Sequence, residues 1–177
     1  MIVYQCWVTG DEMITDAFKH NPVMVDGEEM PGLFEVESST TVKGADNVDI
    51  GCGNAFGGDE EEVADDGAEK VNNVIDPFQY TEVPFGSKVE FRDYLKEYVR
   101  KVRSCLKEAG TPQPEIKEFM GRAPEFVKYL LGMYNEFQFY SGPSFNPEGS
   151  MAFAYYKEGA HNPTFMYIAD GLKVVKF

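Results

Sequence analysis

The sequence predicts an α+β domain in which β-forming segments lie before and after one pair of helices. Helical periodicity is confined to residues 87–137, whereas short apolar runs bounded by turn residues occupy both flanks. A glycine-rich and acidic stretch, about 44–73, interrupts the first flank and predicts a long flexible loop. Strands and helices segregated in this way are typical of an antiparallel or mixed sheet with the helices inserted between strands. At 177 residues, a single domain spanning 1–177 is expected.

The first predicted helix begins with a capping pattern and has two contrasting faces. Ser87 is followed three residues later by Glu90, so each side chain can bind an amide that the first turn leaves unpaired. Apolar residues recur at steps of three and four, namely Phe91, Leu95, Val99, Val102 and Leu106. The opposite side carries basic residues at the same steps: Arg92, Lys96, Arg100, Arg103 and Lys107.

The second predicted helix follows a short connection, residues 109–112, which makes the two helices antiparallel neighbours. Pro114 is placed to begin it. Pro124 lies inside it and cannot donate a hydrogen bond to the carbonyl of Met120. We therefore expect a kink or a break near residues 121–124.

The strands are expected at residues 2–8, 33–37, 74–84, 137–140, 151–156, 164–169 and 172–175. In the segment before Pro84, Phe78, Tyr80 and Val83 are expected on one strand face. Asp170-Gly171 stands between the last two segments, and this dipeptide predicts a hairpin. The C-terminal strands are expected to pair with those of the first half.

Charge and composition restrict the function classes. The net charge is −14, with 3 Lys or Arg against 19 Asp or Glu in residues 1–87, but 10 against 7 in residues 88–128. This balance argues against general nucleic-acid binding and favours protein partners or cations. The 3 cysteines form no CxxC pair, and neither a signal peptide nor an apolar run of about 20 residues is present. A cytoplasmic protein without a membrane span is expected.

Several segments together carry a family resemblance. They are Met1-Ile2-Val3-Tyr4, Asp11-Glu12-Met13, Ile50-Gly51-Cys52-Gly53-Asn54-Ala55, Phe137-Gln138-Phe139-Tyr140-Ser141-Gly142, Asn146-Pro147-Glu148-Gly149 and Phe165–Leu172. In this order the chain resembles the translationally controlled tumour protein (TCTP) family, also called histamine-releasing factor, over essentially its whole length.

The resemblance implies a β-tent fold like that of the Mss4-type exchange chaperones, with a protruding helical hairpin. It also implies a non-enzymatic interaction protein that promotes growth and survival. The family has been linked to Rheb-type small GTPases, elongation-factor exchange subunits and guanine nucleotide exchange, tubulin and microtubules, calcium, and anti-apoptotic partners. This chain departs from the family at Pro143, where a glutamate is usual, and at Phe177, where vertebrate members tend to have cysteine.

Three residues are candidates for partner binding. Glu12, beside Asp11, matches the family position associated with GTPase contact, and Asn54 lies in the glycine-rich signature. The alternative for Glu12 is an ordinary exposed turn carboxylate, and for Asn54 a turn cap. We expect weaker partner binding after Glu12→Val if the first interpretation holds.

Two charged surfaces offer a second hypothesis, a cation-responsive cytoskeletal binder. The acidic run Asp59, Glu60, Glu61 and Glu62 suggests weak calcium binding, although the EF-hand spacing is absent and a solvated linker is the simpler interpretation. The basic face of residues 92–107 could receive tubulin or another acidic partner, or it could be a solvent face with ordinary helix-surface ion pairs.

Catalysis is not expected. The chain has 2 histidines and lacks a Gly-x-Ser-x-Gly motif, a phosphate loop and the cysteines of a zinc ribbon, and no cofactor is implied. The remaining enzymatic hypothesis is redox chemistry at Cys52, which its acidic surroundings disfavour because they raise the pKa of a thiol.

Overall fold

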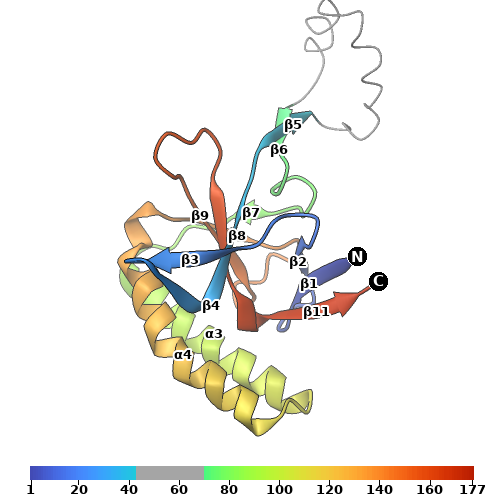
Figure 1. The fold of residues 1–177 in the computed structure, drawn as a ribbon, viewed down its shortest axis with the longest axis vertical. Coiled ribbons are helices and arrows are strands. Elements are labelled where there is room, and N and C mark those ends of the chain that lie inside the picture. The colour runs from blue at the N-terminus through green and yellow to red at the C-terminus, as the bar shows by residue number, and fades with distance from the viewer. Residues whose placement is uncertain (43–69) are drawn as a thin grey trace, which may run out of the picture.

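The computed structural model describes residues 1–42 and 70–177 and places a helical hairpin against one face of a sheet (Figure 1). The strands are β1 (Ile2–Cys6), β2 (Glu12–Thr15), β3 (Asn21–Val25), β4 (Glu28–Glu37), β5 (Thr40–Val42), β6 (Lys70–Asn72), β7 (Thr81–Glu82), β8 (Gln138–Ser141), β9 (Met151–Tyr155), β10 (Thr164–Ile168) and β11 (Leu172–Lys176). The helices are α3 (Lys88–Glu108) and α4 (Gln113–Gly132), with 3-10 turns η2 (Tyr134–Glu136) and η3 (Ala169–Gly171).

The strands form three sheets in the described residues. The largest has the order β3-β4-β10-β9-β8-β7, a second has the order β11-β1-β2, and β5 pairs with β6. All of these pairs are antiparallel. The predicted α+β class is confirmed, and so is the return of the C-terminal strands: β10 pairs with β4, and β11 pairs with β1.

The start of α3 is the one expected from the capping pattern. The Ser87 hydroxyl accepts a hydrogen bond from the Glu90 N–H at 3.3 Å. The Glu90 carboxylate reaches one residue further than expected, because it accepts from the Gly86 N–H at 2.7 Å. The buried side of the helix is apolar, with Phe91, Leu95, Tyr98, Val99 and Val102.

The second helix is continuous through Pro124, so of the predicted kink or break, the break is wrong. Pro124 is exposed and has no N–H to donate to the carbonyl of Met120, and both residues lie along the groove between α3 and α4. Buried side chains before and after the proline, Phe119, Ala123 and Phe126, hold both halves of the helix on the sheet.

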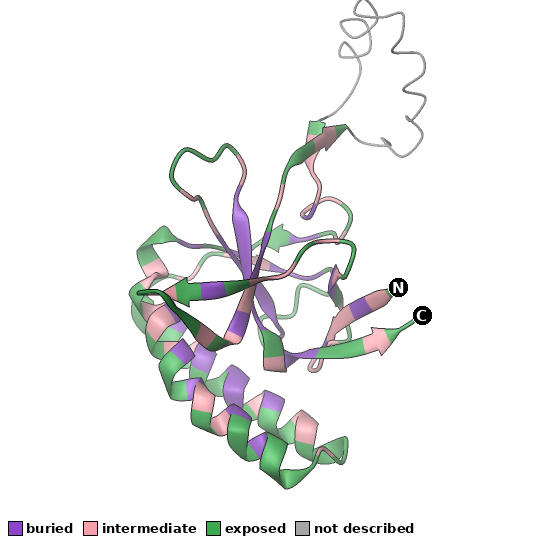
Figure 2. Ribbon diagram, in the orientation of Figure 1, coloured by how far each residue is buried: buried purple, intermediate pink, exposed green. Residues whose placement is uncertain are grey.

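Two strands at the centre of the large sheet are buried on both faces, as Figure 2 shows for β9 and β10. On one face, Phe153 and Met166 pack against the helices. On the other, Ala154 and Phe165 pack toward the sheet that contains β1. This alternation explains why both segments read as uninterrupted apolar runs in the sequence.

The hairpin predicted at Asp170-Gly171 is not formed. These residues belong to η3, and β10 and β11 lie in different sheets. Glycine is needed at position 171 because Tyr98 packs directly against it, and a Cβ there would overlap the Tyr98 hydroxyl. The tight Asp-Gly turn of the described chain is Asp26-Gly27 between β3 and β4, where φ is 52° and 84°.

The boundaries of the middle strands also differ from the prediction. The strand expected over residues 74–84 is reduced to β7, because residues 73–79 form turns and Gln79 has a φ of 55°. Strand β6 occupies the last part of the segment predicted as a loop, and it pairs with β5 so that Val42 lies opposite Lys70.

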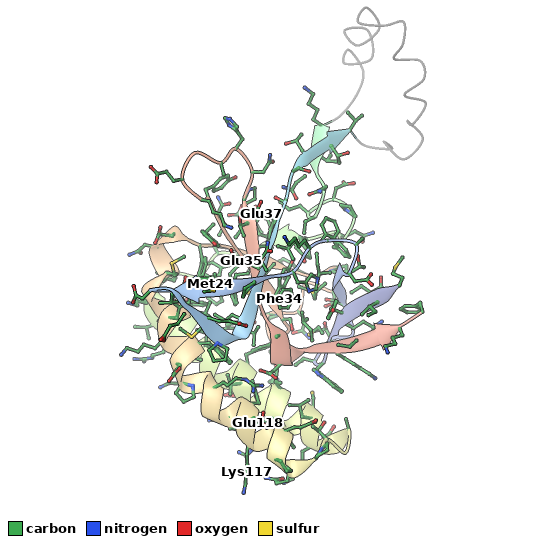
Figure 3. The ribbon with its side chains drawn as sticks, in the orientation of Figure 1. Met24, Phe34, Glu35, Glu37, Lys117 and Glu118 are labelled. Atoms are coloured by element: carbon green, nitrogen blue, oxygen red, sulfur yellow. The ribbon has the colours of Figure 1, made fainter. Side chains whose placement is uncertain are left out.

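A polar network joins Glu35 and Glu37 of β4, which Figure 3 labels, to residues at the end of β9 and just after it. Glu35, which is 7% exposed, accepts a hydrogen bond from the Tyr155 hydroxyl at 2.5 Å and pairs with Lys157 at 3.0 Å. Lys157 also pairs with Glu37 at 3.2 Å. Burial and the bond to Glu35 raise the pKa of Tyr155. Partial burial lowers the pKa of Lys157, but the two carboxylates outweigh it and the net shift is upward.

Candidate partner-binding surfaces

Asp11 and Glu12 lie where the chain turns from β1 into β2. The turn is closed by two backbone hydrogen bonds, from Gly10 N–H to the Cys6 carbonyl and from Cys6 N–H to the Asp11 carbonyl, both at 2.8 Å. Gly10 has a φ of 83°, a conformation that glycine adopts without strain. Glu12 then enters β2 opposite Gln5 of β1.

The carboxylate of Asp11 fastens a distant loop to this turn. Its Oδ2 accepts hydrogen bonds from the hydroxyl of Ser144 at 2.6 Å and from the Ser144 N–H at 3.3 Å. Gly142 packs so closely that an added Cβ would lie 2.6 Å from the same oxygen. Asp11 therefore holds the segment 142–149 in place.

Glu12 is exposed, and its carboxylate has no hydrogen bond or ion pair with any described residue. The two adjacent acids thus differ in what they touch. Asp11 is engaged within the protein, whereas Glu12 presents its charge to solvent, where a partner can reach it.

The loop that Asp11 fastens presents a residue that the sequence interpretation missed. Phe145 is 57% exposed and has a φ of 55°, which is uncommon for an aromatic residue. The far end of the loop is held as well, because the Tyr94 hydroxyl donates to the Gly149 carbonyl at 2.7 Å. An exposed aromatic on a loop fixed at both ends is a candidate contact residue. Its sequence signal is an aromatic between two prolines, Pro143 and Pro147.

Pro143, where the family usually has glutamate, is exposed between the two residues that contact the Asp11 carboxylate. The departure from the family pattern therefore lies beside Asp11, the neighbour of Glu12 in sequence. It removes one negative charge at this position relative to the usual family sequence.

The second predicted surface is the basic face of α3, defined by Arg92, Lys96, Arg100, Arg103 and Lys107. All five side chains are exposed, as the helical spacing predicts. Two have acidic neighbours on the same helix: Arg100 pairs with Glu97 at 3.1 Å, and Arg92 lies 3.6 Å from Asp93.

A groove of about 390 Å³ runs between this basic face and α4. Apolar side chains from both helices form its floor, namely Val99, Met120, Ala123 and Val127. Its rim is formed by three residues of the basic face, Lys96, Arg100 and Arg103. Basic and apolar side chains therefore lie next to each other along the groove.

The remaining predicted residues lie outside the described part of the chain: Asn54, Cys52 and the acidic run Asp59–Glu62. Among residues 1–42 and 70–177, no group of three or more His, Cys, Asp or Glu side chains is arranged to hold a metal ion. No helix in these ranges is long and apolar enough to cross a membrane.

The two described cysteines, Cys6 and Cys105, lie in different environments. Cys6 is buried, and its sulfur accepts hydrogen bonds from the N–H groups of Thr9 and Ser150 at 3.3 and 3.2 Å. Burial, then Glu108 and Cys6, raise the pKa of the Cys105 thiol. A thiol with a raised pKa is a weak nucleophile at neutral pH.

Comparison with known proteins supports the resemblance seen in the sequence. A family model described as translationally controlled tumour protein matches residues 1–173. The structure is similar to the translationally controlled tumour-associated protein p23fyp of Schizosaccharomyces pombe, with 29% identity, all of both chains covered and a TM-score of 0.72. It also has the fold of the translationally controlled tumour protein of Caenorhabditis elegans, with 15% identity, 100% of this chain and 99% of that chain covered, and a TM-score of 0.60. Because the family model matches nearly the whole chain, this protein belongs to the translationally controlled tumour protein family.

Proposed function

We propose that this protein promotes growth and survival as a cytoplasmic interaction protein, and that it binds a Rheb-like small GTPase and an elongation-factor exchange subunit through the surface around Glu12. Family membership supports a general, non-enzymatic role in growth. The observation that carries the site assignment is the contrast between the two turn acids: the Asp11 carboxylate is bound within the protein, and Glu12 is free to meet a partner.

The surface suits a partner that combines a basic group with an apolar patch. Glu12 supplies a charge, and the loop fastened by Asp11 supplies the exposed ring of Phe145 and the exposed Pro143. Rigid loops that present aromatic residues beside charges are common in protein interfaces. A basic residue of the GTPase would pair with Glu12 at this surface.

The test uses purified Rheb-like GTPase loaded with fluorescent GDP. Binding to wild type, Glu12→Val and Phe145→Ala is compared with binding to Glu158→Val, which removes an exposed carboxylate from the loop between β9 and β10. We expect both site variants to bind about tenfold more weakly or worse and the control to match wild type. The rate of GDP release shows whether nucleotide exchange is promoted or inhibited. Equal binding by all four proteins would contradict the site.

The second candidate function is cytoskeletal, and the exposure of all five side chains of the basic face supports it. In this proposal the basic face binds the acidic tail of tubulin, while the acidic run Asp59–Glu62 binds calcium weakly and makes the contact cation-responsive. Deletion of residues 57–69 is expected to change co-sedimentation with microtubules, and Glu12→Val is not. The binding should weaken strongly between low and physiological salt because exposed charges are screened.

A further inference from the structure

The groove between α3 and α4 has properties that neither candidate function uses. Its floor of Val99, Met120, Ala123 and Val127 is apolar, and two of these side chains, Val99 and Ala123, are less than 10% exposed, at 8% and 4%. Among the described residues that line the groove, none is acidic. Its charged lining consists of three cations, Lys96, Arg100 and Arg103, on one side of an apolar surface.

The charge pattern selects an acidic occupant. Arg100 already forms an ion pair with Glu97, but Lys96 and Arg103 form no ion pair with any described residue. From Lys96 to Arg103 the rim follows two turns of helix, or about 10 Å. Carboxylates placed along a neighbouring helix at steps of three or four residues would follow the same line.

The apolar floor selects an occupant that also carries apolar side chains. A flexible acidic tail would pair with the rim but leave the floor in contact with water. An amphipathic helix would cover the floor with its apolar residues at i, i+3 or i+4, and i+7, and removing apolar surface from water is favourable. The lining of the groove thus matches both faces of such a helix.

We propose that the groove between α3 and α4 binds an amphipathic acidic helix of a partner protein. This proposal is independent of the surface around Glu12. Like the tubulin proposal it uses basic residues of α3, but the partner is a helix and not a tubulin tail. The described strands that flank the acidic segment of this chain in sequence, β5 and β6, lie at the end of the molecule opposite the turn between α3 and α4 (Figure 1). We therefore assign the groove to a partner protein.

The test uses fluorescent synthetic peptides of about 16 residues, or roughly four helical turns. The first has Leu at helical steps of three and four, with Glu on the other face. The second has the same composition in scrambled order, and the third has Ala in place of Leu. Anisotropy measures affinity, and amide chemical shifts locate binding on the full chain.

The protein variants test the charged rim and the apolar floor of the groove one at a time. Lys96→Glu with Arg103→Glu reverses two exposed rim charges, whereas Met120→Gln makes the floor polar with little change in length. Lys176→Glu, an exposed charge reversal on β11, is the control. We expect the amphipathic peptide to bind wild type and the control equally, and each groove variant about tenfold more weakly or worse. Shift changes should centre on Val99 and Ala123.

Four results would overturn the proposal. The first is equal affinity for the amphipathic and the Ala peptides, which would mean that charge alone drives binding and would favour an acidic tail such as that of tubulin. The second is equal affinity of wild type and the Met120→Gln protein. The third is binding of anionic phospholipid vesicles without binding of the peptide. The fourth is a tenfold or larger gain in peptide affinity after deletion of residues 57–69, which would make this chain's own segment the occupant.

Discussion

Asp11 and Glu12 are adjacent, but replacing each by alanine should have a different effect. The Asp11 variant should lose stability, whereas the Glu12 variant should lose partner binding. Asp11→Ala removes both hydrogen bonds to Ser144 and the contact with Gly142, so it should destabilise the protein and release the loop 142–149. Glu12→Ala removes a carboxylate with no partner among the described residues. It should therefore leave stability nearly unchanged while it weakens binding of the GTPase.

The magnitude follows from the two bonds. A hydrogen bond to a charged group contributes about 1.5–3 kcal/mol when buried. Ser144 is exposed and Asp11 is half-buried, so water replaces part of each bond in the variant. We expect a loss of about 1–2 kcal/mol for Asp11→Ala, or roughly 2–8 °C in Tm for a chain of this size. For Glu12→Ala the expected change is below about 0.5 kcal/mol.

Urea denaturation followed by circular dichroism gives both free energies, and hydrogen exchange reports on the Ser144 amide. A double-mutant cycle with Ser144→Ala isolates the interaction, and the coupling energy should be about 1 kcal/mol. The reasoning would be refuted by a coupling energy near zero, or by a Glu12→Ala protein that loses as much stability as Asp11→Ala.

Three further predictions concern stability. Gly171→Ala should destabilise the protein by about 3 kcal/mol in urea denaturation, because the added Cβ overlaps the buried Tyr98 hydroxyl. Gly121→Ala, in α4 with open space around it, should stabilise it by about 0.5–1 kcal/mol, and a loss would contradict the packing described. Burial raises the pKa of Tyr80 and Tyr167. Because these tyrosines ionise more readily in the unfolded chain, stability should fall as the pH rises above about 10, by up to about 1.4 kcal/mol per pH unit for each. Tyrosinate absorbance and the urea midpoint measure this fall, and a flat midpoint from pH 9 to 11 would contradict it.

The helices were the most predictable elements, because their signals are local. The cap at Ser87 and the proline at the start of α4 act within one turn, and the structure confirms both helices. The hairpin predicted at Asp170-Gly171 failed for a non-local reason. Gly171 is required by the approach of Tyr98, a residue of α3, and β11 leaves the large sheet to pair with β1.

The binding surface was only partly predictable for a similar reason. The sequence placed Asp11 and Glu12 together at one turn, and both were candidates. What distinguishes them is Ser144, which is 133 residues away along the chain and reaches only Asp11. Phe145 became a candidate only when the structure showed the loop held at both ends.

The pairing of β1 with β11 also has a consequence for the order of folding during synthesis. Residues 2–6 leave the ribosome long before their partners at 172–176 are made, whereas α3 and α4 pack against each other within a continuous stretch of chain. Contacts so distant in sequence form slowly. Until β11 arrives, the face of β9 and β10 that carries Ala154 and Phe165 lacks its full cover. We expect the nascent chain to be most prone to aggregation, and most dependent on chaperones, just before its last strand emerges.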